Sequence, residues 1–372
     1  MAKLDTFNDP FDFHIRTLPE PNPDIQTLRV YTNEGVITKF RNLTYDTYEV
    51  VITCPEGSHK LSARAGQYGT IKVDGMQKPR SYSFAKTPEL ENPNEYTFFI
   101  RLVEGGEFSG WLSEKNREGE KVLISGPMGK FGLDDSNKSM VCIAGGSGMS
   151  AINALVEQVN VKGIERDCYF FYGARTQKDL YLVDELNALA DNWPGGKLFK
   201  FIPVLSEEPE DSDWDGPRGF VTQHVKEEYL DKGVFNSGDI KAFFCGPPPM
   251  IDHGVKALEE AGLSSSDIYY DKFEDARSPA PVIDNAKCVL CDECLMAKPI
   301  KNCIVEATNF KVSNGDVTSF ERVRPGHTSG LYYNSLFIDE TECIRCYACV
   351  DACPHEAISP VYAQVPQILR KL

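Results

Sequence analysis

The sequence predicts a multidomain protein in which an antiparallel β-barrel comes first, an α/β domain with a parallel sheet follows, and a small α+β domain rich in cysteine comes last. Three observations carry this prediction. Short β-rich runs separated by turn residues fill positions 35–124, without a long helical pattern. From residue 139, apolar runs alternate with amphipathic segments, as in βαβ units. Eight of the 12 cysteines follow residue 287.

The composition is that of a globular chain long enough for two or three domains, with 372 residues, 41% hydrophobic and 25% charged. The formal net charge of −16 argues against nucleic acid or an anionic membrane as a partner, because like charges repel. The first residues lack the apolar core of a secretory signal, and no apolar run of about 18 residues occurs. We therefore expect a soluble, cytoplasmic protein, in which clustered cysteines indicate metal rather than disulfides.

The predicted domains follow from where these patterns change. A polar extension covers 1–33, and the barrel covers 34–135 with strands at GVITKF, YEVVIT, YGTIKV, YTFFIRLV and KVLISG. The α/β domain covers 136–275, with strands at SMVCIAGG, RDCYFFYGA, LFKFIPVL and IKAFFCGP and helices at INALVEQVN, LVDELNALA and MIDHGVKALEEA. A linker at 276–283 leads into the cysteine-rich domain, 284–372.

Two segments of the barrel offer groups for a flat, phosphate-bearing ligand. In KPRSYSFA, Arg80 suits a diphosphate, Tyr82 suits stacking on a heterocycle, and the Ser83 hydroxyl suits a ring nitrogen; an ordinary surface strand is the equal alternative. In GGEFSGWLSE, Gly106 and Ser109 precede or begin a short helix whose free N–H groups attract phosphate, although a merely capped helix explains them as well.

The α/β domain carries two segments typical of ligand-binding strand ends. SMVCIAGGSGMS places Gly145, Gly146 and Gly148 between a strand and a helix, where glycines let the backbone approach a pyrophosphate. It is not GxGxxG, and a turn without binding function is the alternative. CGPPPM follows the strand IKAFF, so Cys245 lies at a strand tip as a ligand contact or a structural thiol.

Taken in order, RSYS, GGEFS, GPMGKFG, AGGSGMS, YGART and CGPPPM make residues 35 to 273 resemble the ferredoxin–NADP reductase-like flavoprotein family, most closely the reductase components of bacterial oxygenases. The resemblance implies that Arg80 binds the flavin diphosphate, Tyr82 stacks on the isoalloxazine and Ser83 approaches flavin N5. It implies catalytic roles for Ser83, Cys245 and Glu274. It also implies binding contacts for a larger set: Gly106 and Ser109 at the flavin pyrophosphate, Gly145, Gly146 and Gly148 at the nicotinamide dinucleotide, Cys245 and Gly246 near the nicotinamide, and Phe273 and Glu274 close to the flavin.

The nucleotide is predicted from charge. NADPH requires cations around its 2′-phosphate, and Arg175 and Lys178 could supply them. Asp179, Asp184 and Glu185 follow directly, which favours NADH. The resemblance favours FAD over FMN.

The second of two cysteine ladders, CIRCYACVDACP, has the C-x2-C-x2-C-x3-C-P spacing of bacterial [4Fe–4S] proteins. Zinc is the weaker alternative, because it prefers two separated CxxC pairs. The first ladder, CVLCDEC, aligns on the second without gaps, and CIVEA aligns on CPHEA. This duplication predicts two clusters with exchanged fourth ligands: Cys288, Cys291, Cys294 and Cys353 for one, and Cys343, Cys346, Cys349 and Cys303 for the other.

The predicted function is a conduit from NADH through FAD to the clusters, and then to a separate acceptor. In the family this acceptor is commonly a monooxygenase or dioxygenase, and we expect it to dock at the ferredoxin domain. The benzoyl-CoA epoxidase reductase resembles this chain in joining two [4Fe–4S] clusters to such a module, although at the other end. An NADH:ferredoxin-type oxidoreductase of anaerobic metabolism and an electron-transfer subunit of a larger complex are the alternatives. The segment 309–336 is expected to be a passive loop with a hairpin at SNGD, and a cover over a cluster or a docking surface are the alternatives.

Overall fold

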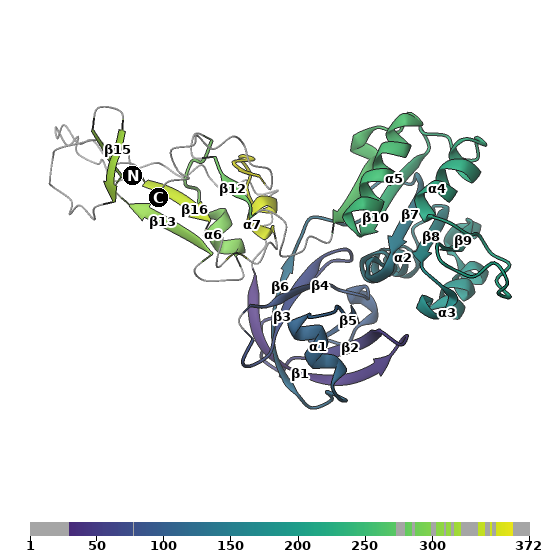
Figure 1. Ribbon diagram of the computed structural model, residues 1–372, viewed down its shortest axis with the longest axis horizontal. Coiled ribbons are helices and arrows are strands. Elements are labelled where there is room, and N and C mark those ends of the chain that lie inside the picture. The colour runs from purple at the N-terminus through teal and green to yellow at the C-terminus, as the bar shows by residue number, and fades with distance from the viewer. Residues whose placement is uncertain are drawn as a thin grey trace.

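The computed structural model has a barrel of strands, a parallel sheet flanked by helices, and a smaller cysteine-rich part (Figure 1). It describes residues 30–76, 78–272, 280–284, 287–298, 303–308, 310–313, 316–320, 334–338, 343 and 347–359. Most of the predicted extension lies outside these ranges, as do Phe273, Glu274 and Cys346. No helix within them is long and apolar enough to span a membrane.

The first part is a six-stranded antiparallel sheet in the order β4-β3-β6-β1-β2-β5. A bridge between Phe84 and Phe98 joins its two edge strands, so the sheet closes into the predicted barrel. Side chains such as Ile52 and Ile124 are fully buried in its apolar interior. Its elements are β1 (Tyr31–Asn42), β2 (Thr47–Thr53), β3 (Tyr68–Lys72), β4 (Arg80–Ser83), β5 (Glu95–Arg101), α1 (Glu107–Ser113) and β6 (Lys121–Met128).

The second part is a five-stranded parallel sheet in the order β11-β10-β7-β8-β9. The strand order reverses between β7 and β10, so their carboxyl ends border the crevice in which open α/β sheets bind ligands. Cys142 and Val141 point to opposite faces, each covered by helices. Its elements are β7 (Ser139–Gly145), α2 (Met149–Val161), β8 (Cys168–Ala174), α3 (Val183–Ala188), β9 (Phe199–Leu205), α4 (Val221–Val225), β10 (Ile240–Gly246), α5 (Pro248–Glu260) and β11 (Ile268–Lys272).

Helix α2 attaches the parallel sheet to the barrel. The Ser150 hydroxyl donates to the Phe99 carbonyl at 3.3 Å, and the Asn153 amide donates to the Ala85 carbonyl at 2.9 Å. Phe99 and Ala85 belong to the same buried cluster as Met149 of α2. This shared core fixes the glycine turn, from which α2 begins, relative to the barrel.

The cysteine-rich part pairs strands across the two halves of its sequence. Strand β12, before the first ladder, pairs with β17, after the second, and β13, after Cys303, pairs with β16, before the second ladder. Asp292 and Tyr347 hold the same position in the two ladders, have positive φ of 63° and 55°, and each precedes a short helix carrying the third cysteine. The sequence repeat is therefore visible in the backbone.

Strands β14 and β15 form an antiparallel pair on either side of the SNGD segment, as predicted. The elements of this part are β12 (Val282–Ile283), α6 (Glu293–Ala297), β13 (Ile304–Thr308), β14 (Phe310–Ser313), β15 (Asp316–Phe320), β16 (Asn334–Ile338), α7 (Ala348–Asp351) and β17 (Ile358–Ser359).

Candidate functional site

Strand β4 carries the three residues that the resemblance assigns to the flavin ring and diphosphate. Ser83 is 5% exposed, and its hydroxyl has no hydrogen-bond partner among the described residues. A buried hydroxyl without a partner costs free energy, so this group fits a ligand that supplies the missing hydrogen bond, as a flavin ring nitrogen would. The Tyr82 ring lies 5.6 Å from the Phe108 ring, centroid to centroid, and burial raises the pKa of Tyr82.

The side chain of Arg80, the first residue of strand β4, reaches the beginning of helix α1. Its Nη2 donates to Glu107 Oε2 at 3.1 Å, in the first turn of the helix. Gly106 is the N-cap residue, and the Ser109 hydroxyl accepts a hydrogen bond from the Val103 amide at 3.1 Å. The fold thus brings Arg80 to the first turn of helix α1. The Ser109 oxygen instead accepts a hydrogen bond from the segment that precedes the helix. Phosphate contacts by Gly106 and Ser109 stay predictions.

The glycine turn after β7 packs directly against the tip of β10. A Cβ on Gly148 would overlap the carbonyl oxygen of Cys245 and lie 2.8 Å from the amide nitrogen of Gly246. Gly146 has a φ of 54°, in the left-handed region that favours glycine. The third glycine is therefore needed for close packing of the turn on a strand, independently of any ligand.

A cavity of about 690 Å³ opens beside this turn, within the size range of ligand-binding sites. Both parts of the molecule line it, because Asp46 and Arg101 come from the barrel and Gly145, Gly146 and Arg175 from the α/β domain. Of the other predicted nucleotide contacts, Gly148, Cys245 and Gly246 form the packed strand tip next to the cavity rather than its wall.

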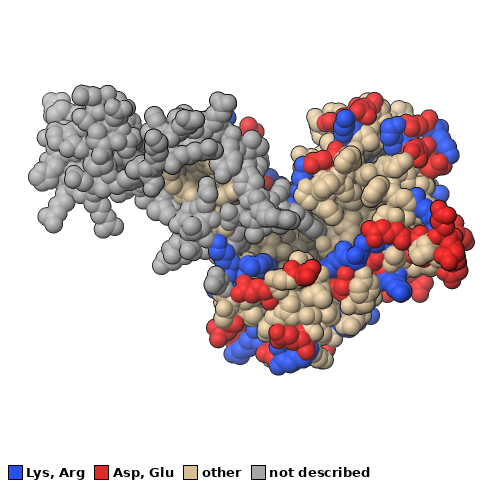
Figure 2. Space-filling view, viewed as in Figure 1, with Lys and Arg blue, Asp and Glu red and all other residues tan. Residues whose placement is uncertain are grey.

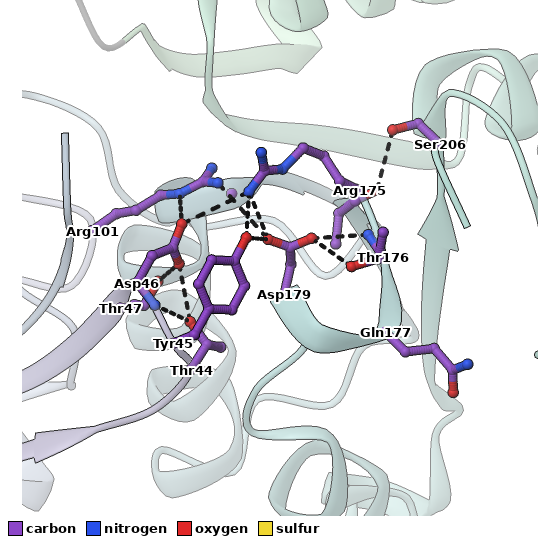
Figure 3. Close-up of polar contacts among 12 residues, drawn as sticks. Thr44, Tyr45, Asp46, Thr47, Arg101, Arg175, Thr176, Gln177, Asp179 and Ser206 are labelled. Carbon is purple, nitrogen blue, oxygen red and sulfur yellow. Dashed lines mark hydrogen bonds and ion pairs between the residues drawn. The ribbon is translucent and has the colours of Figure 1, made fainter. Parts of the chain in front are cut away.

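Two arginines of the cavity wall belong to a polar network that crosses between the barrel and the α/β domain (Figure 3). Arg101 Nε donates to Asp46 Oδ2 at 2.8 Å, and its Nη2 lies 3.8 Å from Asp179 Oδ1. Arg175 Nη2 donates to Asp179 Oδ1 at 2.9 Å and to the Tyr45 hydroxyl at 2.6 Å. Tyr45 in turn donates to Asp179 Oδ1 at 2.9 Å. Burial alone would raise the pKa of Asp179, but its hydrogen bonds hold that pKa below the usual value.

The tip of the sheet brings a thiol and a carboxyl together. Cys245 is fully buried, burial raises its pKa, and it is paired in register with Asp271 of β11. Burial raises the pKa of Asp271 to about 7, and the Asp351 carboxylate of α7 adds to the shift. Asp271 can therefore hold or release a proton near neutral pH. The predicted catalytic Glu274 and flavin contact Phe273 lie outside the described residues.

Sequence reasoning missed Arg101 and Asp271. Arg101 Nη1 lies only 3.3 Å from the position of a Cβ on Gly146, although the two residues are in different domains. No local pattern could have indicated this contact, because it depends on how the domains pack. The sequence does carry a signal for Asp271: in the segment YYDKFE, a carboxyl lies near the end of a β-rich run. This run forms the strand beside the one that carries Cys245.

A small second cavity lies between the two cysteine ladders. Burial is the main reason that the pKa of Cys294 is raised to about 12, and three neighbouring thiols contribute. Thiols held together in this way lose their protons to a bound metal, so the donor set fits an iron–sulfur cluster. The cysteines lining the cavity are Cys288, Cys291, Cys294 and Cys353, the four predicted as ligands of one cluster.

The second predicted ligand set is described only in part. Cys303, Cys343 and Cys349 are buried, and Cys303 and Cys349 share one apolar cluster. Cys346 lies outside the described residues. Within the described ranges, no three His, Cys, Asp or Glu side chains are placed to hold a single metal ion.

Three family models match the chain in the order of its structural parts. The description "Oxidoreductase FAD-binding domain" matches residues 34–132, "Oxidoreductase NAD-binding domain" matches 142–256, and "4Fe-4S binding domain" matches 336–359.

Known proteins are similar to this chain over about three fifths to two thirds of its length. The xylene/toluene monooxygenase electron transfer component XylA of Pseudomonas putida is 37% identical over 248 residues, 67% of this chain and 67% of the relative. The phenol 2-monooxygenase reductase component DmpP of Pseudomonas sp. (strain CF600) is 34% identical over 218 residues, 58% of this chain and 59% of the relative. The chain thus spans about three fifths to two thirds of the length of these relatives.

Solved structures show the same fold. The ferredoxin reductase in carbazole 1,9a-dioxygenase has a TM-score of 0.57 and 27% identity, covering 66% of this chain and 70% of its own. The Amycolatopsis cytochrome P450 reductase GcoB has a TM-score of 0.58 and 28% identity, covering 66% of this chain and 71% of its own.

Proposed function

The chain belongs to the ferredoxin–NADP reductase-like family of flavoprotein oxidoreductases, and from this premise we propose that it is an NADH-dependent reductase that passes electrons through FAD and two [4Fe–4S] clusters to a separate oxygenase component. The observation that carries the proposal is the joint cavity, because Arg101 of the barrel and Gly146 of the α/β domain face one space. This joint lining supports direct transfer between a nucleotide and a flavin.

The flavin site is proposed on β4 and α1. A bound flavin accepts a hydride and releases electrons singly, which couples a nicotinamide to iron–sulfur clusters. The Ser83 hydroxyl would donate to a ring nitrogen, Tyr82 would pack on the ring, and Arg80 would hold the diphosphate beside Gly106 and Ser109. The Ser83 hydroxyl, which has no hydrogen-bond partner within the described ranges, supports this assignment.

The nucleotide is proposed to be NADH rather than NADPH. The described Arg and Lys side chains that line the cavity all have carboxylate partners, so a 2′-phosphate would compete for each of them. Acidic side chains also gather along the outer edge of the α/β domain, at the right of the view (Figure 2), so this edge offers no electrostatic attraction to an additional phosphate. The ion pairs are Arg101–Asp46, Arg175–Asp179, Lys226–Asp231 and Lys256–Glu260.

The strand tip is proposed to border the nicotinamide. Gly145, Gly146 and Gly148 would place backbone amides toward the dinucleotide, with Cys245 behind them. The Asp271 carboxyl, next to Cys245 in the sheet, is the group there that can hold a proton near neutral pH.

The clusters are proposed to have the exchanged ligand sets that the sequence repeat predicts. The cavity between three cysteines of the first ladder and Cys353 supports the first set. The strand pairs β12–β17 and β13–β16 support the second, because the same exchange brings Cys303 toward the second ladder. A two-cluster ferredoxin fold follows for this part.

The acceptor is proposed to be an oxygenase component that docks at the cysteine-rich part. Two similar proteins support this class of partner, because one is the electron transfer component of xylene/toluene monooxygenase and the other is the reductase component of phenol 2-monooxygenase.

The decisive experiment is anaerobic titration of the reconstituted full-length protein. NADH is expected to bleach the flavin absorbance and then reduce the clusters, seen by electron paramagnetic resonance, whereas NADPH does so at much higher concentration. Unchanged flavin absorbance after excess NADH would contradict the proposal.

Substitution of one hydroxyl tests the flavin site. Ser83→Ala is expected to slow flavin reduction at saturating NADH by roughly tenfold or more, the equivalent of one hydrogen bond to a buried partner. Ser81→Ala is the control, because Ser81 is exposed on the same strand. Equal rates for both variants would refute the assigned contact.

A further inference from the structure

Five residues join the barrel to the α/β domain at the cavity mouth, and we name them the clasp: Tyr45, Asp46, Arg101, Arg175 and Asp179 (Figure 3). Tyr45 and Asp46 lie in the connection between β1 and β2, and Arg101 ends β5. Arg175 and Asp179 follow β8. Tyr45 is the bridging residue, because its hydroxyl contacts both Arg175 and Asp179 across the domain boundary.

The clasp differs in character from the attachment made by α2. The hydrogen bonds of Ser150 and Asn153 are buried in the shared core. Tyr45 is 60% exposed, and 44% of the Arg175 side chain is exposed, so solvent weakens the contacts between them. We therefore expect the contacts of α2 with the barrel to persist in the folded state. The contacts of the clasp can break and re-form without unfolding of either domain.

The clasp also borders the space that a nucleotide would occupy. Asp46, Arg101, Arg175 and Asp179 all line the cavity. Their two positive and two negative charges cancel, so the paired clasp offers an incoming phosphate no net attraction. An arginine released from its carboxylate would add a positive charge to the cavity.

Tyr45 supplies one of the two close contacts of the Arg175 guanidinium, and the only one of the two that comes from the barrel. Arg175 Nη2 has Asp179 Oδ1 at 2.9 Å and the Tyr45 hydroxyl at 2.6 Å, while Asp46 Oδ2 is more distant at 3.8 Å. The hydrogen bond that Arg175 donates to Asp179 is the main reason that the pKa of Arg175 is raised. Without the hydroxyl, Arg175 has only Asp179 as a close partner, and only the longer ion pairs of 3.8 Å, Arg175–Asp46 and Asp179–Arg101, still link the two residues to the barrel, so Arg175 is held less firmly.

We propose that Tyr45 is a positioning residue for the nicotinamide nucleotide, acting through Arg175 and Asp179 to fix the width of the cavity and to withhold Arg175 from a 2′-phosphate. This rests on the proposed function of the cavity. The clasp then sets nucleotide affinity and the preference for NADH, and it does not take part in hydride transfer.

The test is Tyr45→Phe in the full-length holoprotein, which removes one exposed oxygen and leaves the core intact. Stopped-flow flavin reduction at increasing NADH gives an apparent Kd and a limiting rate. The apparent Kd is expected to rise about two- to fivefold, the range for an exposed hydrogen bond to a charged group, with an unchanged limiting rate. The apparent Kd for NADPH is expected to change less or to fall, so the ratio between the nucleotides narrows.

Tyr169→Phe is the matched control, because Tyr169 lies near the other end of β8 and is not among the residues lining the cavity. An unchanged NADH Kd in Tyr45→Phe, with or without a lower thermal midpoint, would overturn the inference, as would an equal rise in the control. Wild-type flavin that NADH does not bleach would instead overturn the proposed function, so the two failures are distinguishable.

Discussion

Replacement of Gly148 by alanine is expected to damage both stability and nucleotide binding. Gly148 has a φ of −61°, which alanine adopts freely, so backbone strain plays no part. The obstacle is the tip of β10: the added methyl group would overlap the Cys245 carbonyl oxygen and crowd the Gly246 amide. Because these atoms belong to a central strand, they cannot rotate away as a side chain would.

The magnitude follows from overpacking. An extra methyl group in a packed site costs about 1–3 kcal/mol, and a backbone obstacle places this case at the upper end. Alanine also reduces the conformational entropy of the unfolded chain relative to glycine, which offsets about 0.5–1 kcal/mol of this loss of stability. A net loss of about 2 kcal/mol lowers the thermal midpoint of a domain of this size by roughly 4–10 °C. A displaced turn that loses one amide–phosphate hydrogen bond weakens nucleotide binding by roughly tenfold or more.

Thermal unfolding followed by circular dichroism and titration with NADH measure the two effects. Gly238→Ala is the control, because its Cβ would lie 4.0 Å from the nearest atom, Asn236 Oδ1, and its φ is not in the left-handed region. Equal midpoints and equal NADH affinities for Gly148→Ala and Gly238→Ala would refute the close-packing argument.

The remaining predictions concern a cluster and Glu91, a half-buried carboxyl that accepts a hydrogen bond from the Thr97 amide of β5. If Cys291 and Cys353 ligate the same cluster, either single variant, Cys291→Ser or Cys353→Ser, should lose about half of the bound iron. The double variant should lose no more than that, because the second substitution affects a cluster that is already lost. Near-total loss of iron in the double variant alone would contradict the shared site. Burial raises the pKa of Glu91 to about 7, above its ordinary 4.5, so its contribution to stability is present below pH 4.5 and is lost as the pH rises through 7. Glu91→Gln should therefore reduce the loss of unfolding free energy between pH 5 and 8 by about 1–2 kcal/mol, a figure already lowered for the partial exposure of the side chain. Urea titrations at each pH measure this difference. A pH dependence equal to that of the wild type would refute the raised pKa of Glu91.

Much of the architecture is local information that the sequence carries by itself. The change from short β-rich runs to βαβ alternation predicted the barrel and the parallel sheet, because strand and helix periods are properties of neighbouring residues. The ordered motifs placed Arg80, Tyr82 and Ser83 on one strand, and the structure has them on β4. Helix α4 was not predicted, because it changes after five residues into a π-helical segment over Lys226–Leu230, and this change interrupts the regular helical period.

The sequence by itself determined the three-part order, the glycine turn and the two aligned cysteine ladders, since each is written in consecutive residues or in a repeat. Only the tertiary structure decided which distant groups meet. It buries the Ser83 hydroxyl without a hydrogen-bond partner in the described part of the chain, sets Asp271 beside Cys245, and draws Arg101 and Tyr45 against the α/β domain. These contacts join residues far apart in the chain, and their geometry depends on how two domains pack through α2, which no local pattern encodes.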